Sequence, residues 1–145
     1  MPMKRLEYLR GISDEECARL RRVGVLNSNQ LIHATTLVID RDRLARRTGI
    51  TANQLLALGE QAQLLEVSGI SRWLQAVVRL GITSVRQLAR EQPAELHERI
   101  VRLTGPGSAP MPSDVEYWVS QARYLDIVEI AEETRTDRLR RWSPR

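Results

Sequence analysis

The chain contains no phenylalanine and a single cysteine, and its other aromatic residues are limited to three tryptophans and three tyrosines. Because Cys17 has no second cysteine to pair with, an internal disulfide is excluded, and a reducing, cytoplasmic setting is expected. No apolar run approaches the roughly 18 residues of a membrane-spanning helix, and no hydrophobic signal segment follows Met1. We therefore expect a globular protein without a transmembrane segment.

Leucine, alanine, arginine, glutamate and glutamine are abundant instead, and all five favour helices. Apolar residues recur at helical spacing, and no strict alternation of apolar and polar residues lasts long enough for a strand. At 145 residues, the chain can form one domain or two small units that share a core. The sequence thus predicts an all-α fold.

The net charge of +4 is concentrated at the C-terminal end. Residues 1–134 hold 17 basic and 17 acidic residues, whereas residues 135–145 carry five arginines against Asp137. The excess charge therefore belongs to a basic tail and does not indicate a basic body. This tail could contact nucleic acid, an anionic membrane surface or an acidic protein groove, or it could simply keep the chain soluble. Its candidate binding residues are Arg135, Arg138, Arg140, Arg141 and Trp142.

One sequence pattern occurs twice in the chain. The segment from Leu6 to Ser13 is repeated from Leu64 to Ser71, and each copy is followed by a glycine turn, at Gly24 and Gly81. Each copy has the pattern of a helix end, a Gly-Ile-Ser turn, a helix, a glycine turn and a second helix. The pattern predicts one helical hairpin used twice. We expect Gly24 and Gly81 to occupy equivalent left-handed backbone positions.

The repeat divides the chain into a helical domain, residues 1–134, and the basic tail, residues 135–145. Within the domain we expect a first hairpin and then a set of linking helices. A second hairpin and a set of closing helices follow. The approximate bounds, in that order, are 3–35, 36–63, 64–92 and 93–134.

Local signals predict where some of these helices begin and end. The segment from Ser13 to Glu16 has the sequence of a capping box, and the segment from Ser113 to Glu116 has the same pattern. The second box is expected to start the longest helix, which would lie across both hairpins and close the core. Gly59 is expected to kink or break a linking helix.

The two Gly-Ile-Ser hairpins resemble tandem helix-hairpin-helix motifs. Over roughly residues 6–130 the chain is more closely similar to an uncharacterised family of double helix-hairpin-helix domains, domain of unknown function 4332. Residues 43–50, 64–89 and 113–125 carry this resemblance. Residues 81–88 also resemble the hairpin of the C-terminal domain of the bacterial RNA polymerase alpha subunit. The resemblance implies two hairpins closed by a long C-terminal helix, and it implies no settled activity.

Helix-hairpin-helix motifs that bind DNA present backbone amides of a glycine turn to a phosphate, and here serine replaces the second glycine in both copies. In the first copy, three acidic residues follow Ser13 and would repel a phosphate, so that turn is expected to be structural. In the second copy, Arg72 follows Ser71. Its positive charge is either solvated or paired with a phosphate or with a partner's carboxylate. The candidate anion or partner site consists of Gly69, Ile70, Ser71, Arg72 and Trp73.

Two further features remain open on the sequence. Trp73 is either a core residue or an exposed anchor. A basic helix face is either a solvated surface, offset by Asp40 and Asp42, or a track for phosphates. The arginines of this face are Arg43, Arg46 and Arg47, with Arg41 beside them.

The sequence indicates neither a catalytic site nor a metal site. His33 and His97 are far apart, and neither has a second ligand at metal-site spacing, so no metal or cofactor is expected. No catalytic motif occurs, and no enzymatic activity is expected. The leading hypothesis is a helical adaptor that acts by protein–protein interaction in a larger assembly, since the body is neutral and the first hairpin acidic. The alternative is DNA or RNA binding through the second hairpin and the basic tail.

Overall fold

The computed structural model describes residues 4–125, which form helices joined by short turns, with no strand among them. The prediction of an all-α fold is confirmed. Two of the elements, η1 and η2, are short 3₁₀ helices. In chain order the elements are η1 (Leu6–Tyr8), α1 (Asp14–Arg22), α2 (Ser28–Thr35), α3 (Val38–Thr48), α4 (Ala52–Leu64), η2 (Ser71–Trp73), α5 (Leu74–Arg79), α6 (Val85–Ala89), α7 (Pro93–Thr104) and a helix at residues 112–125.

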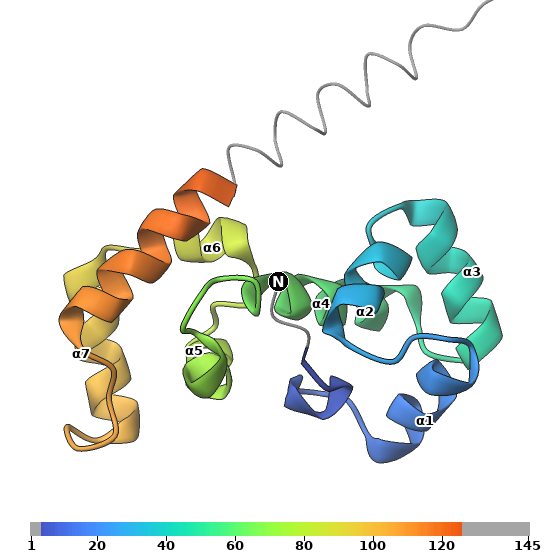
Figure 1. The fold of residues 1–145 in the computed structure, drawn as a ribbon, viewed down its shortest axis with the longest axis horizontal. Helices are drawn as coiled ribbons and strands as arrows, with labels where there is room; N and C mark the ends of the chain where they lie inside the picture. Colours follow the sequence, from blue (N-terminus) through green and yellow to red (C-terminus); the bar gives the residue numbers. More distant parts are fainter. Residues whose placement is uncertain (1–3, 126–145) are drawn as a thin grey trace, which may run out of the picture.

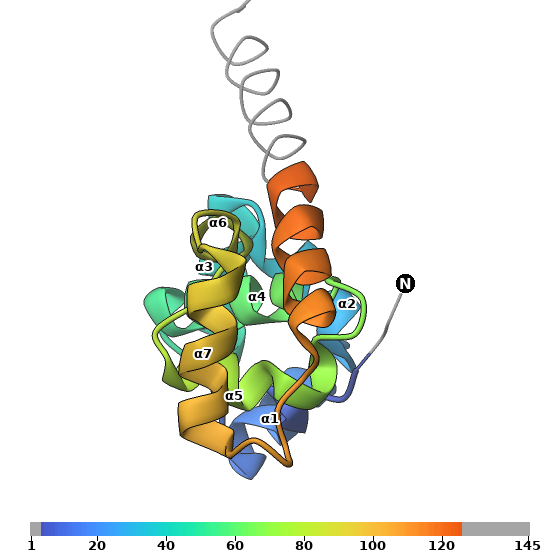
Figure 2. The same ribbon diagram turned by 90° about the vertical axis from the view of Figure 1, so that its left-hand side faces the viewer.

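The helices are arranged on two sides of a central element. Figure 1 shows α1, α2 and α3 on one side, α5, α6 and α7 on the other, and α4 between them. The helix at 112–125 lies beside α6 and α7 in Figures 1 and 2. Aliphatic side chains from both sides form a shared core cluster that extends from Leu6 to Ala122. Each large aliphatic side chain buried there contributes about 1.5–3 kcal/mol, which compensates for the absence of phenylalanine.

Equivalent caps begin the second helix of each pair. The Asn27 side chain accepts a hydrogen bond from the Gln30 N–H at 2.9 Å, and the Ser84 hydroxyl accepts one from the Gln87 N–H at 3.2 Å. Each glutamine side chain in turn accepts a hydrogen bond from the backbone N–H that precedes the cap residue. These bonds satisfy N–H groups that a helix start leaves without an internal partner.

Six glycines have positive φ within residues 4–125. The predicted pair, Gly24 and Gly81, has φ values of 90° and 92°, and each N–H donates to the carbonyl three residues before it. Their predicted equivalence is therefore confirmed. Gly11 (81°) and Gly69 (85°) lie in the two Gly-Ile-Ser turns, whereas Gly49 (76°) and Gly105 (89°) follow α3 and α7 with ψ values of 3° and 152°.

Two glutamines hold equivalent backbone positions on the two sides. Gln61 of α4 exchanges two hydrogen bonds with the backbone of Arg10, at 2.8 and 2.9 Å. Gln121 does the same with the backbone of Ser68, at 2.9 and 3.4 Å. In this contact the helix at 112–125 corresponds to α4. Both α3 and α7 end in a threonine that donates to the carbonyl four residues before it, at 2.8 Å, so we align α7 with α3. We call residues 6–64 the first half and residues 65–125 the second half.

Gly59 does not break its helix, contrary to expectation. The α4 helix runs without interruption from Ala52 to Leu64. A Cβ at Gly59 would lie 2.2 Å from the Thr35 hydroxyl oxygen, so glycine allows α2 and α4 to approach closely. This tertiary contact outweighs the cost of glycine in a helix interior, about 0.5–1 kcal/mol.

The predicted capping box at Ser113 is also wrong. The helix begins one residue earlier, at position 112, which is a proline and suits a first helical position. The cap residue is therefore Met111, whose N–H donates to the Asp114 carboxylate at 3.0 Å. Over its described residues this helix contacts other elements of the second half, where Arg123 donates to the Ala89 carbonyl at 3.1 Å. Its expected extension over the first hairpin lies outside the described residues.

Candidate binding site at the Gly69–Trp73 turn

The turn that begins the second half differs from its counterpart in the first half. Ser13 caps α1 with a complete capping box, as expected. Ser71 is not a cap: the residue before it, Ile70, has helical dihedrals, and the Trp73 N–H donates to the Ile70 carbonyl at 2.8 Å. Because Leu74 stands where the first half has Glu16, no capping box can form, and the first turn tightens into the 3₁₀ helix η2.

Trp73 is held by the interior of the second half. Its ring lies 5.7 Å from the ring of Trp118, and its indole N–H donates to the Ser108 carbonyl at 3.0 Å. These contacts leave Trp73 half-buried, whereas Trp118 is buried. Arg72 is exposed, with its guanidinium 5.1 Å from the centre of the Trp73 ring. The turn therefore presents the arginine to solvent and keeps the tryptophan for packing.

A hollow of about 480 Å³ lies between this turn and the N-terminal segment. Gln75 of α5 donates a hydrogen bond to the Tyr8 carbonyl at 2.8 Å and so fixes the two walls relative to each other. We call this feature the arginine hollow; it is lined by Arg5, Glu7, Tyr8, Ser71, Arg72 and Gln75.

The carboxylate in the arginine hollow is already engaged. Glu7 accepts a hydrogen bond from the guanidinium of Arg21, which lowers the pKa of the Glu7 carboxyl below its usual value. Among the described residues, no carboxylate forms an ion pair with Arg5 or Arg72. The hollow is thus lined by two arginines that have no ion-pair partner among the described residues.

The equivalent turn of the first half is satisfied by its own carboxylate. Glu16 accepts hydrogen bonds from the Ser13 N–H at 2.9 Å and from the Gln54 amide at 2.7 Å. The bond from Ser13 is the main cause that lowers the pKa of Glu16. Asp14 occupies the position that corresponds to Arg72. The two turns therefore carry opposite charge at the residue after the turn serine and differ in backbone conformation.

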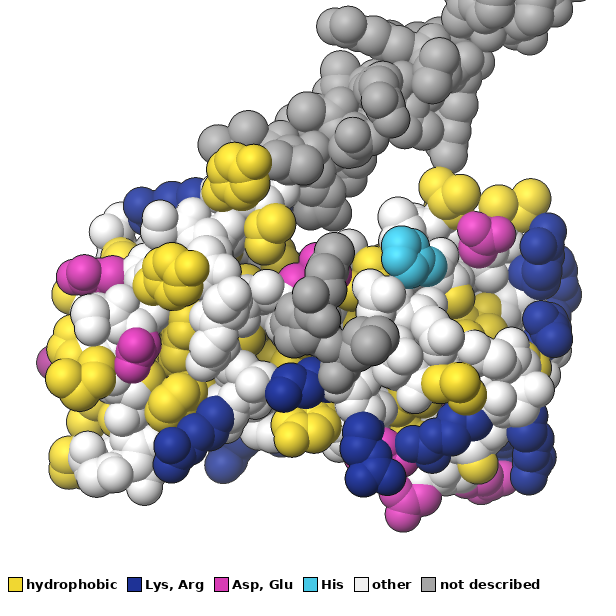
Figure 3. All heavy atoms as spheres, in the orientation of Figure 1, with side chains coloured by type: hydrophobic (Ala, Val, Ile, Leu, Met, Phe, Trp, Pro, Cys, Tyr) yellow, Lys and Arg dark blue, Asp and Glu magenta, His cyan; other side chains and the backbone are white. Residues whose placement is uncertain are grey.

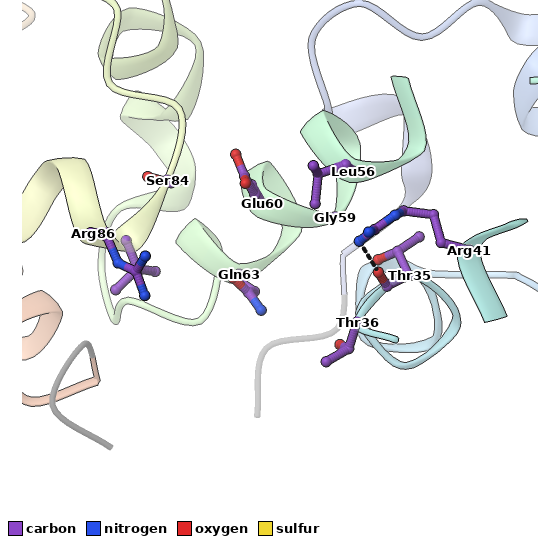
Figure 4. Close-up of a pocket in the computed structure, with 10 residues that line it drawn as sticks. Thr35, Thr36, Arg41, Leu56, Gly59, Glu60, Gln63, Ser84 and Arg86 are labelled. Atoms are coloured by element: carbon purple, nitrogen blue, oxygen red, sulfur yellow. Dashed lines mark hydrogen bonds between the residues drawn. The ribbon is translucent and has the colours of Figure 1, made fainter. Parts of the chain in front are cut away.

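The arginines of the predicted basic face point into three different surroundings. Arg43 and Arg47 line one hollow beside α2, while Arg46 lines another at the start of α3. The guanidinium of Arg41 donates to the Thr35 carbonyl at 2.9 Å, at the α2 and α3 side of a pocket that residues of α4 and α6 also line (Figure 4). No single hollow is lined by all four arginines.

Sequence reasoning missed an exposed aliphatic surface where α3 follows α2. Leu37, Val38 and Ile39 are 45%, 57% and 64% exposed. Figure 3 shows hydrophobic side chains at this corner, beside charged ones. We call these three residues the aliphatic patch; the second half has Pro93, Ala94 and Glu95 at the corresponding positions. The sequence signal was a run of three adjacent aliphatic residues, which cannot all lie on the face that one helix turns toward the protein core.

The basic tail residues lie outside the described part of the chain. Within residues 4–125, no helix has the length and apolar character to cross a membrane. In the same residues, no group of histidine, cysteine, aspartate or glutamate side chains is placed to hold a metal ion.

The geometry defines an all-α protein in which glycine turns, helix caps and glutamine contacts recur in two parts of the chain. The chain belongs to the family described as "Domain of unknown function (DUF4332)", whose model matches residues 10–125. The predicted resemblance to domain of unknown function 4332 is thereby confirmed. Neither a curated protein nor a solved structure matches the chain.

Proposed function

We propose that the protein is a non-enzymatic adaptor that binds a partner protein through the aliphatic patch, in the reducing cytoplasm. The observation that carries this proposal is the exposure of three adjacent aliphatic side chains, Leu37, Val38 and Ile39. Apolar surface left in water costs about 25 cal/mol per Å², and an apolar surface on a partner would recover that free energy.

Charged residues at the rim of the patch support a protein partner. Asp42 and Arg46 line the same hollow as the three aliphatic residues, a space of about 530 Å³. Within the described residues neither forms an ion pair, although they are four positions apart on α3. An apolar centre with a charged rim is the usual arrangement of a protein–protein interface.

Nucleic-acid binding is the second candidate function. In this view the pairs α1–α2 and α5–α6 are helix-hairpin-helix motifs, and the second pair would contact a phosphate with help from the basic tail. The observation that favours it is the presence of Arg5 and Arg72 on one hollow without carboxylate partners. The acidic Asp14 at the position equivalent to Arg72 argues that the first pair could not assist.

The variant Ile39→Glu tests the adaptor proposal. The second half carries Glu95 at the corresponding position of the matching helix, so the fold should accept this change. Proteins that copurify with the full chain would be isolated, and their affinity for each variant would be measured by calorimetry. We expect Ile39→Glu to weaken binding by about tenfold or more, because a carboxylate would be buried against apolar surface.

The matched control is Leu26→Glu. Leu26 is an aliphatic residue of similar exposure, 54%, in the turn that precedes α2, whereas the patch follows α2. This variant should bind within about twofold of the unmodified protein, since Leu26 lies outside the patch. A partner that binds Ile39→Glu as tightly as the unmodified chain would contradict the proposed function.

A further inference from the structure

We propose that the outer face of the helix at 112–125 joins two copies of this chain in an antiparallel homodimer. This inference goes beyond the adaptor function and concerns a different surface from the aliphatic patch. Two tyrosines mark the face: Tyr117 is 58% exposed and Tyr124 is 69% exposed. Figure 3 shows hydrophobic side chains along this helix on the face turned to the viewer. We call Tyr117, Ser120 and Tyr124 the tyrosine face.

The buried and exposed residues of this helix lie on opposite faces. The side chains buried in the core are those of Val115, Trp118, Val119 and Ala122. Residues three, four and seven positions apart share one face of an α-helix, so Tyr117, Ser120 and Tyr124 lie together on the other. The helix thus leaves aromatic surface exposed, and tyrosine is enriched where proteins contact each other.

The charges beside the tyrosine face identify a second copy as its partner. Glu116 and Arg123 are both exposed, and neither forms an ion pair among the described residues. They are seven positions apart, about 10 Å along the helix, so they cannot pair within one chain. A twofold axis beside Ser120 would place Glu116 of each copy opposite Arg123 of the other. A dimer therefore forms two ion pairs that a single chain cannot form.

Arg123 is held in position for such a pair. Its Nε donates to the Ala89 carbonyl at 3.1 Å, and its Nη2 donates to the Glu91 carbonyl at 3.3 Å. Neither bond engages Nη1, which remains as a donor for a carboxylate. An ordered guanidinium loses little conformational entropy when it binds.

The same twofold axis also pairs the tyrosines. Because Ser120 lies midway between Tyr117 and Tyr124, the Tyr117 ring of each copy would lie beside the Tyr124 ring of the other. Serine is small, so the two helices can approach closely where they cross. A hollow of about 280 Å³, lined by Ser120 and Tyr124 together with Glu66, Gln121 and Leu125, leaves space for the incoming ring. One register thus satisfies the charges, the aromatic rings and the close approach.

Sedimentation equilibrium of the full chain over a concentration series tests the association. We expect a species of twice the mass of the chain that dissociates on dilution. Ser120→Arg should weaken association by about tenfold or more, because it places two like charges at the crossing. Glu116→Arg should weaken it for the same reason. Adding Arg123→Glu to Glu116→Arg should restore most of the loss, because both ion pairs then form with exchanged charges.

The control for the charge changes is Asp14→Arg. It makes the same change in charge at an exposed position of α1, in the other half of the molecule, and the second half carries Arg72 at the corresponding position. Association should stay within about twofold of that of the unmodified chain. Circular dichroism of every variant shows that the helical fold is retained.

Disulfide formation between copies tests the antiparallel register. Ser120→Cys should give a covalent dimer on mild oxidation, because a disulfide requires Cα atoms within about 7 Å of each other. The native cysteine, Cys17, is buried and should not interfere. Ser113→Cys is the matched control: Ser113 is exposed on the same face, but the register separates its two copies by about 20 Å.

Cross-linking through Ser120→Cys but not Ser113→Cys, together with rescue by the exchanged charges, supports the proposal. Equal cross-linking of both cysteine variants would overturn it, because the register would then not be antiparallel about Ser120. A chain that stays monomeric at every concentration would also overturn it. Self-association that Ile39→Glu abolishes and Ser120→Arg leaves unchanged would assign the contact to the aliphatic patch and overturn it as well.

Discussion

Glycine is required at Gly81 and at Gly59 for two different physical reasons. The φ of Gly81 is +92°, a conformation that residues with a Cβ rarely adopt, although nothing lies within 4 Å of a Cβ built there. At Gly59 the obstacle is space, because an added Cβ would meet the hydroxyl oxygen of Thr35 at 2.2 Å. The first requirement follows from a local turn pattern, whereas the second exists only once α2 and α4 have packed.

Gly59→Ala should destabilise the protein by about 1–3 kcal/mol, the usual cost of overpacking. Thr35→Ala in the same chain should recover part of that loss, because it removes the atom that the new methyl group meets. Urea unfolding of the two single variants and the double variant measures the coupling. Gly107→Ala serves as the control, since Gly107 has neither a positive φ nor a neighbour within 4 Å. Additive effects of the two substitutions would contradict this account of Gly59.

At the scale of elements, helix starts could be predicted where adjacent residues alone decide them. Ser13 and Ser84 cap their helices as their local sequences indicate. The segment from Ser113 to Glu116 has an equally good pattern, but the proline at position 112 already takes the first helical position, so the cap falls on Met111. A capping sequence thus identifies a nearby helix start, and the neighbouring residues decide which residue becomes the cap.

The variants Asp114→Ala and Ser113→Ala distinguish the observed cap from the predicted one. Asp114→Ala removes the acceptor for the Met111 N–H and should lower the free energy of unfolding by about 0.5–2 kcal/mol. Ser113 is exposed, and its alanine variant should change that free energy by less than about 0.5 kcal/mol. Thermal and urea unfolding give both values. The reverse order of effects would restore Ser113 as the cap.

The contacts that join elements could not be predicted from the sequence. Gln61 reaches the backbone of Arg10, 51 positions away, and Gln121 reaches Ser68 across 53 positions. A buried glutamine has no periodic signature that would mark it as such a clamp. The sequence therefore predicts that the glycine turns at Gly24 and Gly81 are equivalent, but it does not predict any equivalence between the linking and closing helices.

At the scale of the whole molecule, the two halves share several glycine turns, caps and glutamine contacts and differ on their surfaces. The first half has Asp14 where the second has Arg72, and it exposes Ile39 where the second has Glu95. Both candidate sites lie at these differences. The Gly69–Trp73 turn was predictable because its charge breaks a local rule for helix starts. Its partners Arg5 and Tyr8, and the exposure of the aliphatic patch, depend on how the segments pack.

The central claim is that this protein binds a protein rather than a nucleic acid. Titration of random-sequence duplex DNA with the full chain, at physiological salt and across a salt series, tests it most directly. The account predicts binding no tighter than about 10⁻⁴ M, the weak end of the non-specific range. Micromolar binding with a steep salt dependence, whose slope falls by about one on Arg72→Glu, would contradict it and identify the second half as a phosphate-binding element.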